Sequence, residues 1–186
     1  MVVQRPRFRW TVDEYEKMIR HGILTENHKV ELIRGEIVPT MSIGDLHASC
    51  LNRLVELFFD LVGKSATISV QNPIRLADSE PEPDVTLLVR RADFYAAGKP
   101  RPADVYLVLE VADASLAYDR EVKAPLYAEN GIAECWIVNL VDRCLEVCRQ
   151  PRADGTYGDV QTLRPGESVA LALLPAVSVA VADLIP

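Results

Sequence analysis

Helical spacing of apolar residues marks two segments near the beginning of the chain. Leucine, valine and phenylalanine recur every three or four residues between His47 and Gly63, which predicts a long helix with the glycine as its stop. A shorter helix is predicted over residues 11–21, where Thr11 and Glu14 have the spacing of a capping box.

A third helical segment is interrupted by a proline. Residues 115–130 carry suitable cap and stop residues, but Pro125 lacks a backbone N–H, and in a regular helix its ring clashes with the carbonyl of Glu121. We therefore expect either a kink at this position or a second helix that begins close to Lys123.

Shorter apolar runs between these helices predict strands. Residues 31–38 form two short strands around Arg34-Gly35, the pattern of a tight hairpin, and residues 135–149 predict a second hairpin. The tail, rich in Gly, Pro and Val, predicts short strands that extend the sheet. Single strands are predicted at residues 67–70, 74–76, 85–89 and 105–111. Strands combined with two main helices predict an α/β fold, a central mixed sheet flanked by helices, in one domain over residues 1–186.

The composition is that of an ordinary globular protein. Of the 186 residues, 49% are hydrophobic and 25% are charged, which excludes the disordered and fibrous classes. No apolar run is long enough to cross a bilayer, and no signal peptide is expected because no apolar stretch follows the arginine-rich start. The four cysteines are expected to be free thiols, since only Cys144 and Cys148 are close and no second ligand pair follows them. These features favour the cytoplasm, and Trp10 and Trp136 are predicted to lie in the core.

Common catalytic motifs are missing from the sequence, which leaves carboxylates as the candidate chemistry. There is no G-x-S-x-G elbow, H-E-x-x-H, Walker loop or G-x-G-x-x-G fingerprint. Glu110 interrupts an otherwise apolar strand, where a carboxylate is costly unless it is paired or bound to metal. Asp84 opens another predicted strand. If the two strands are neighbours, both carboxylates meet at one end of the sheet and offer oxygen ligands suited to Mg²⁺ or Mn²⁺.

Lys123 is the candidate cation of such a site. It lies in the helical segment that follows the Glu110 strand, beside the inward-facing Val122. There it would orient an attacking water and offset the charge of a phosphate. The alternative is a surface ion pair with Asp119, one helical turn earlier. For Asp84 the alternative is a solvated acid at a strand entry, and for Glu110 it is a buried pair with an arginine or lysine.

Several short motifs together resemble one known family. Along the chain they are E-L-I-R-G-E-I-V at residues 31–38, His47 at a helix start, P-D-V at 83–85, L-E-V at 109–111, Asp119 with Lys123, and C-W-I-V at 135–138. Their order and spacing, which cover the chain from Tyr15 to its last residues, resemble the Uma-two family of restriction-type endonucleases in the PD-(D/E)xK nuclease superfamily.

The resemblance implies a restriction-endonuclease-like fold and assigns roles to three residues. Asp84 and Glu110 would be the metal ligands of the nuclease core. The signature lysine usually stands two residues after the glutamate, but Ala112 occupies that place, and Lys123 matches the displaced position on the following helix. The chain departs from the family at residues 112–115, which are A-D-A-S where the family usually has Ser-Pro-Ser, so only the final Ser is kept.

Two further site residues are implied by the same resemblance. Glu31 would be an additional acidic member, and His47 would be a polar residue at the mouth of the site. The residues alone leave alternatives, because Glu31 can equally face solvent on a hairpin edge, like Glu36, and His47 can be a helix cap or a core residue. Glu80 and Glu82 are predicted to be solvated loop charges.

The expected activity is hydrolysis of DNA phosphodiester bonds with Mg²⁺ or Mn²⁺. Nucleases of this superfamily commonly cut both strands with two copies, which implies a homodimer. The rival interpretation is a catalytically inactive nuclease-fold protein that acts as a nucleic-acid-binding or assembly module. The joint presence of Asp84, Glu110 and Lys123 favours the enzyme.

The acidic charge is unevenly distributed. The formal net charge is -7, yet Lys and Arg nearly balance Asp and Glu up to Ala77, so the excess acid lies in the later part of the chain. Arg90, Arg91, Lys99 and Arg101 lie in the loop after the Asp84 strand, where they are candidates to meet phosphate. This charge predicts weak, metal-dependent binding of DNA that decreases with salt.

Overall fold

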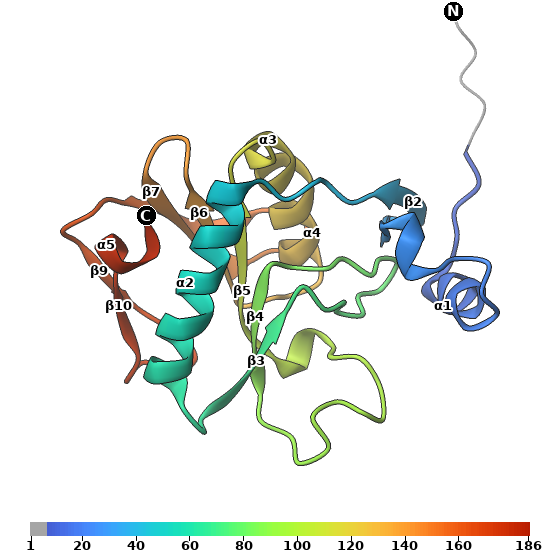
Figure 1. Ribbon diagram of the computed structural model, residues 1–186, viewed down its shortest axis with the longest axis horizontal. Helices are drawn as coiled ribbons and strands as arrows, with labels where there is room; N and C mark the ends of the chain where they lie inside the picture. Colours follow the sequence, from blue (N-terminus) through green and yellow to red (C-terminus); the bar gives the residue numbers. More distant parts are fainter. Residues whose placement is uncertain (1–6) are drawn as a thin grey trace, which may run out of the picture.

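A six-stranded sheet forms the centre of the molecule, which a computed structural model describes over residues 7–186 (Figure 1). The strand order is β3-β4-β5-β6-β7-β8, and within this sheet only β5 and β6 pair in parallel. The strands are β3 (Ala66–Val70), β4 (Val85–Val89), β5 (Val105–Ala112), β6 (Glu134–Asn139), β7 (Cys144–Pro151) and β8 (Tyr157–Leu163). The first six residues, where no signal peptide was expected, lie outside the described part. The mixed sheet predicted from the sequence is confirmed.

Helices cover both faces of this sheet. On one face lies α2 (Asp45–Val62), which begins two residues before His47 and ends at Gly63 as predicted. On the other face, the β5–β6 crossover consists of α3 (Leu116–Tyr118), a π-helical turn (Asp119–Lys123) and α4 (Ala124–Glu129). A helical segment that begins again beside Lys123 is what the position of Pro125 predicted.

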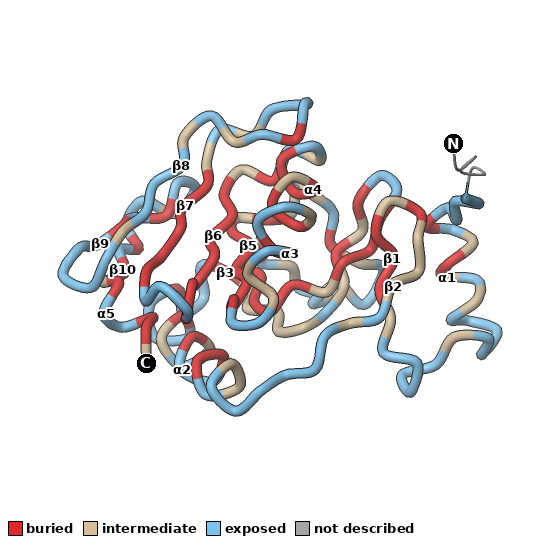
Figure 2. Tube along the Cα trace, turned by 90° about the horizontal axis from the view of Figure 1, so that it is seen from above, coloured by how far each residue is buried: buried red, intermediate tan, exposed pale blue. Residues whose placement is uncertain are grey.

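Alternation along β5 sorts its side chains between the two faces. Leu107, Leu109 and Val111 pack with α2, whereas Val108 and Ala112 pack with α4. Glu110 lies between Val108 and Ala112 and therefore belongs to the α4 face. Figure 2 shows the buried chain concentrated along β5, β6 and β7. The strand thus carries its carboxylate into the interior beneath the crossover helix.

The β1–β2 hairpin and α1 form a smaller unit beside the sheet (Figure 1). Strands β1 (Val30–Ile33) and β2 (Glu36–Pro39) pair antiparallel around Arg34-Gly35, both with positive φ, as the sequence predicted. Helix α1 (Val12–Arg20) begins with the expected capping box. A 3₁₀ turn (Glu26–His28) lies between α1 and β1, and another (Pro102–Asp104) precedes β5.

Two strand predictions are wrong. Residues 74–76 form no strand, because the Ile74 and Leu76 N–H groups bind the nearby loop carbonyls of Pro81 and Ser79, although both side chains are buried. In the tail, β8 extends the sheet, but β9 (Ser168–Ala170) and β10 (Ser178–Ala180) form a separate pair followed by α5 (Val181–Leu184). This pair stays apart because its valines pack against the α2-face core.

The expectations about cysteines and membrane spans can be compared directly with the structure. All four cysteines are free and buried. Of the helices within residues 7–186, none has the length and hydrophobicity needed to span a membrane. Trp136 is fully buried, as predicted, but Trp10 is 37% exposed and lies outside the core, because its edge-on partner Phe8 is itself exposed.

Candidate functional site

Asp84 and Glu110 lie on neighbouring strands at the same end of the sheet. The antiparallel register of β4 and β5 pairs Val85 with Leu109, which brings Asp84 beside Glu110. The Val111 N–H donates to Asp84 Oδ2 at 2.8 Å. Both carboxylates are buried, with exposed fractions of 9% for Asp84 and 2% for Glu110. The structure therefore brings together the two acids that the sequence singled out.

Four neighbours bind the Asp84 carboxylate or favour its ionised form. His47, in the first turn of α2, donates from Nε2 to Asp84 Oδ1 at 2.9 Å, and Gln71 Nε2 donates to the same oxygen at 3.3 Å. Burial would raise the pKa of Asp84, but His47, the Val111 N–H and the charge of Lys123 hold it below its usual range. The same hydrogen bond raises the pKa of His47 against the opposing effect of burial.

Glu110 is bound at both oxygens by groups from the crossover helix. Lys123 Nζ donates to Oε2 at 3.2 Å, and the Tyr127 hydroxyl donates to Oε1 at 2.5 Å. Burial raises the pKa of Glu110 to about 8, although the charge of Lys123 opposes this shift. Burial alone would lower the pKa of Lys123, but Glu110, Glu31 and the other nearby acids raise it above its usual value. The surrounding acids therefore favour the charged form of Lys123.

Glu31 approaches the site from the hairpin. It is buried in β1, so the solvent-facing alternative is wrong, and its Oε2 accepts a hydrogen bond from the Glu82 N–H at 3.1 Å. Its charge acts on Lys123, which places it within electrostatic range of the ammonium group without a direct hydrogen bond. Glu36, on the other arm, pairs with Arg9 at the surface.

Two buried residues of the site were given no site role from the sequence, although Asp119 was among the motifs of the family resemblance. Tyr127 is fully buried, and Asp119 is 3% exposed and accepts a hydrogen bond from Ser115 Oγ at 2.6 Å. Burial raises the pKa of Asp119 to about 6. The proposed surface pair of Asp119 with Lys123 is wrong, because both side chains face inward and Lys123 binds Glu110. The signal available in the sequence was the four-residue spacing of Asp119, Lys123 and Tyr127.

Two predictions about charged loops are corrected by the structure. Glu80 is buried rather than solvated, since it pairs with Lys99, while Glu82 is half-buried. The loop that carries Lys99 joins the far ends of β4 and β5 and lies at the bottom of Figure 1, opposite the ends that bear Asp84 and Glu110. This basic loop therefore does not line the carboxylate site.

The carboxylate oxygens of Asp84 and Glu110 fit a metal ion that keeps most of its bound waters. Within residues 7–186, no group of three or more His, Cys, Asp or Glu side chains is arranged to hold a metal. Three of the four oxygens of Asp84 and Glu110 accept a single hydrogen bond each and so retain a lone pair. Mg²⁺ is usually bound by one or two carboxylates plus waters and substrate phosphate, and Asp84 with Glu110 matches that pattern.

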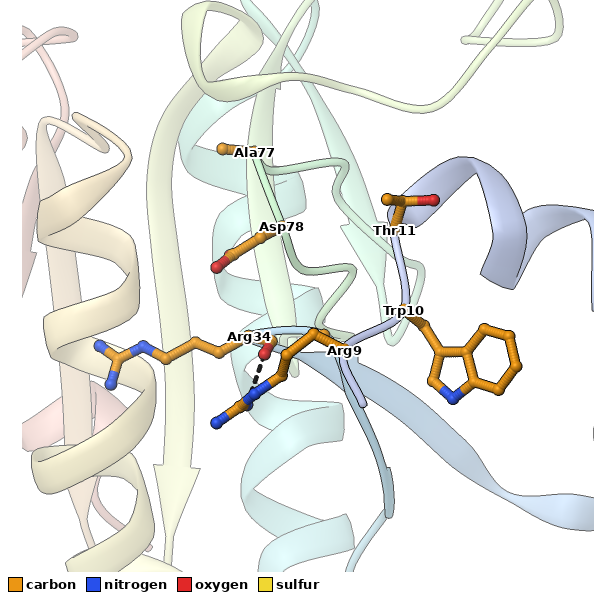
Figure 3. Close-up of a pocket in the computed structure, with 7 residues that line it drawn as sticks. Arg9, Trp10, Thr11, Arg34, Ala77 and Asp78 are labelled. Atoms are coloured by element: carbon orange, nitrogen blue, oxygen red, sulfur yellow. Dashed lines mark hydrogen bonds between the residues drawn. The ribbon is translucent and has the colours of Figure 1, made fainter. Parts of the chain in front are cut away.

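A separate hollow of about 430 Å³ lies between the N-terminal segment and the hairpin turn. Figure 3 shows Arg9, Trp10, Arg34 and Asp78 around it, with Arg9 Nη1 donating to the Arg34 carbonyl at 2.6 Å. Its lining includes none of the five residues that the sequence proposed for the site.

The sheet order, the helices on both faces and the carboxylates at the strand ends define a restriction-endonuclease-like nuclease fold. The chain belongs to the Uma2 family, described as "putative restriction endonuclease", whose model matches residues 12–182. A crystal structure titled as a "putative nuclease belonging to DUF820" from Anabaena variabilis ATCC 29413 is similar, with a TM-score of 0.71 and 14% identity. The match covers 94% of this chain and 96% of that one, and it shows a shared fold. Comparison with curated proteins gives no match. The resemblance and the fold class predicted from the sequence are confirmed.

Proposed function

We propose that the protein is a nuclease that hydrolyses DNA phosphodiester bonds with a divalent metal, Mg²⁺ or Mn²⁺. The observation that carries the proposal is the pair of buried carboxylates, Asp84 and Glu110, on adjacent strands with the cation Lys123 bound to one of them. Ionisable groups with displaced pKa values that gather in this way are typical of functional sites. Membership of a family described as restriction endonucleases supports the phosphodiester as the bond that is attacked.

Asp84 and Glu110 would hold the metal. When bound, such an ion polarises a phosphodiester and lowers the pKa of water. Asp84 is ready for this role because His47 and the Val111 N–H fix the orientation of its carboxylate. Glu110 would bind in its ionised form, so its proton must leave when the ion arrives.

Lys123 would act on the water and on the phosphate. Its ammonium group lies 3.2 Å from Glu110 Oε2 and stays protonated, so it can orient an attacking water and offset negative charge on the phosphate. Glu31 contributes to the charge that keeps Lys123 protonated. The roles proposed for Glu31 and His47 are therefore to support Lys123 and Asp84.

One observation favours a second candidate function. Both oxygens of Glu110 are already bonded, to Lys123 and Tyr127, which is also the arrangement of a closed structural ion pair. A nuclease-fold protein that binds nucleic acid or assembles with a partner without cleaving would have such a pair.

A DNA cleavage assay tests the proposal. Supercoiled and linear DNA are incubated with the protein and Mg²⁺ or Mn²⁺, and EDTA replaces the metal in the blank. We expect Asp84→Asn and Glu110→Gln to reduce the rate by roughly a hundredfold or more, as loss of an electrostatic catalytic group does. Asp60→Asn and Glu56→Gln make the same chemical changes at exposed positions of α2 and should cleave normally. Binding without cleavage by the wild type would support the second candidate, and full activity in Glu110→Gln would refute the site assignment. RNA of the same sequence, run in parallel, tests the choice of DNA.

A further inference from the structure

The crossover helix contains a single widened turn. From Leu116 to Glu129 the backbone is helical, but the Ala124 N–H donates to the carbonyl of Asp119, five residues earlier. A π-helical turn of this kind holds about one residue more than an α-turn and is frequent at functional sites. This π-turn lies directly over the buried end of β5, and a physical cause for it can be found in the sequence.

Pro125 supplies that cause. In a regular helix the N–H of residue 125 would donate to the carbonyl of Glu121, but proline has no N–H and its ring would collide with that oxygen. A wider turn before the proline moves this carbonyl away. Pro125 then occupies the first turn of α4, where a missing N–H costs nothing.

The widened turn changes which side chains share a face. Asp119, Lys123 and Tyr127 are spaced by four residues, and in an α-helix each step of four overshoots a full turn by about 40°, so the outer two would diverge by about 80°. In a π-turn four residues fall short of a full turn, so the displacement between Asp119 and Lys123 reverses sign. The α-turn from Lys123 to Tyr127 then cancels this angular displacement, so all three side chains point the same way.

The observed contacts agree with this alignment. Asp119, Lys123 and Tyr127 are all buried, whereas Arg120 and Glu121 in the same turn are exposed. Lys123 and Tyr127 bind the two oxygens of Glu110. Asp119 is fixed by the Ser115 hydroxyl on the side of the helix that faces these groups.

We infer that Pro125, by setting the π-turn, places Asp119 in the site as a positioning residue for Lys123. The Asp119 carboxyl group is a further buried acidic group near the ammonium group, besides Glu110 and Glu31, and it restricts where the ammonium group can lie. The inference rests on the proposed function for its catalytic meaning, but the placement of Asp119 and Lys123 is measurable without any cleavage.

Pro125→Ala is the main test, since it allows the regular hydrogen bond to Glu121 and an ordinary α-turn. Glu121→Ala is the matched control, because it introduces an alanine at an exposed position of the same turn and keeps Pro125. Asp119→Asn serves as the reference, because it shows how the NMR resonance of Lys123 changes when the negative charge of Asp119 is removed.

The first measurement is the NMR resonance of the Lys123 ammonium group in the metal-free protein. Pro125→Ala should shift this resonance as Asp119→Asn does, whereas Glu121→Ala should leave it unchanged. An unchanged resonance in Pro125→Ala would overturn the inference. Because this readout needs no substrate, it decides the positioning even if the wild type does not cleave nucleic acid.

The second measurement combines thermal unfolding with cleavage. We expect Pro125→Ala to melt at or above the temperature of the wild type, because the helix regains a hydrogen bond, and yet to cleave at least tenfold more slowly. A purely structural proline would give the opposite pattern, a lower melting temperature with activity lost only in proportion to the unfolded fraction. That outcome would also overturn the inference.

Discussion

Replacement of Glu110 by glutamine should change how the stability of the metal-free protein depends on pH. The carboxyl group is fully buried, and its pKa rises from 4.5 to about 8 in the folded chain. The substitution keeps the shape of the side chain and leaves an acceptor for Tyr127, but it removes the titration.

The sign follows from proton binding in the two states. Between pH 4.5 and about 8 the folded protein keeps the Glu110 proton while the unfolded chain releases it, so the free energy of unfolding falls as the pH rises through this window. One pKa unit corresponds to about 1.4 kcal/mol, so the loss summed over the window is at most about 5 kcal/mol. Lys123 adds no slope there, because it is protonated in both states throughout.

Chemical denaturation in EDTA, repeated across that pH window, measures the effect. The free energy of unfolding of Glu110→Gln relative to wild type should increase by about 1 kcal/mol per pH unit. Glu56→Gln, an exposed position of α2, corrects for the general change in charge. Parallel pH profiles for Glu110→Gln and the wild type would show that Glu110 titrates normally, and the description of a carboxyl group kept neutral by burial would be wrong.

Three other substitutions test separate parts of the structure. Lys123→Met should destabilise the fold by about 3 kcal/mol above the pKa of Glu110, and the double variant with Glu110→Gln should recover most of that loss in denaturation experiments; additive losses would rule out coupling. His47→Ala should raise the pKa of Asp84 and weaken Mn²⁺ binding by roughly ten- to a hundredfold in calorimetry, whereas unchanged affinity would place His47 outside the site. Gly35→Ala should lower the free energy of unfolding by more than about 1 kcal/mol, because φ is +73° and the new Cβ would lie 2.9 Å from a neighbouring Cβ; wild-type stability would contradict this packing.

The meeting of Asp84 and Glu110 was predictable because it depends on local rules. Glu110 stands out against an apolar strand, and Asp84 opens a strand that pairs directly with it. Strand alternation and the pairing of two strands that follow one another in the chain are enough to bring the two side chains to one end of the sheet. For the same reason the capping box of α1 and the β1–β2 hairpin were predicted correctly.

The errors concern features that depend on distant partners. The burial of Glu80 depends on Lys99, and its backbone pairs with Leu32, 48 positions away in the chain. Residues 74–76 have an apolar pattern but bind carbonyls of the following loop instead of a neighbouring strand. The four-residue spacing of Asp119, Lys123 and Tyr127 was visible in the sequence, but their alignment depends on a widened helical turn that a fixed helical period does not show.

The two faces of the sheet differ in when their cores can be completed during synthesis. The buried residues of the core beneath α4 lie between Ile33 and Cys148, so they are present before the tail emerges. The core beneath α2 needs Val169, Val179 and Leu184 as well. The face of the sheet that carries Glu110 can therefore pack first. The apolar side of α2 stays partly uncovered until the β9–β10 pair folds over it. In the growing chain, that side of α2 is an apolar surface open to misassociation.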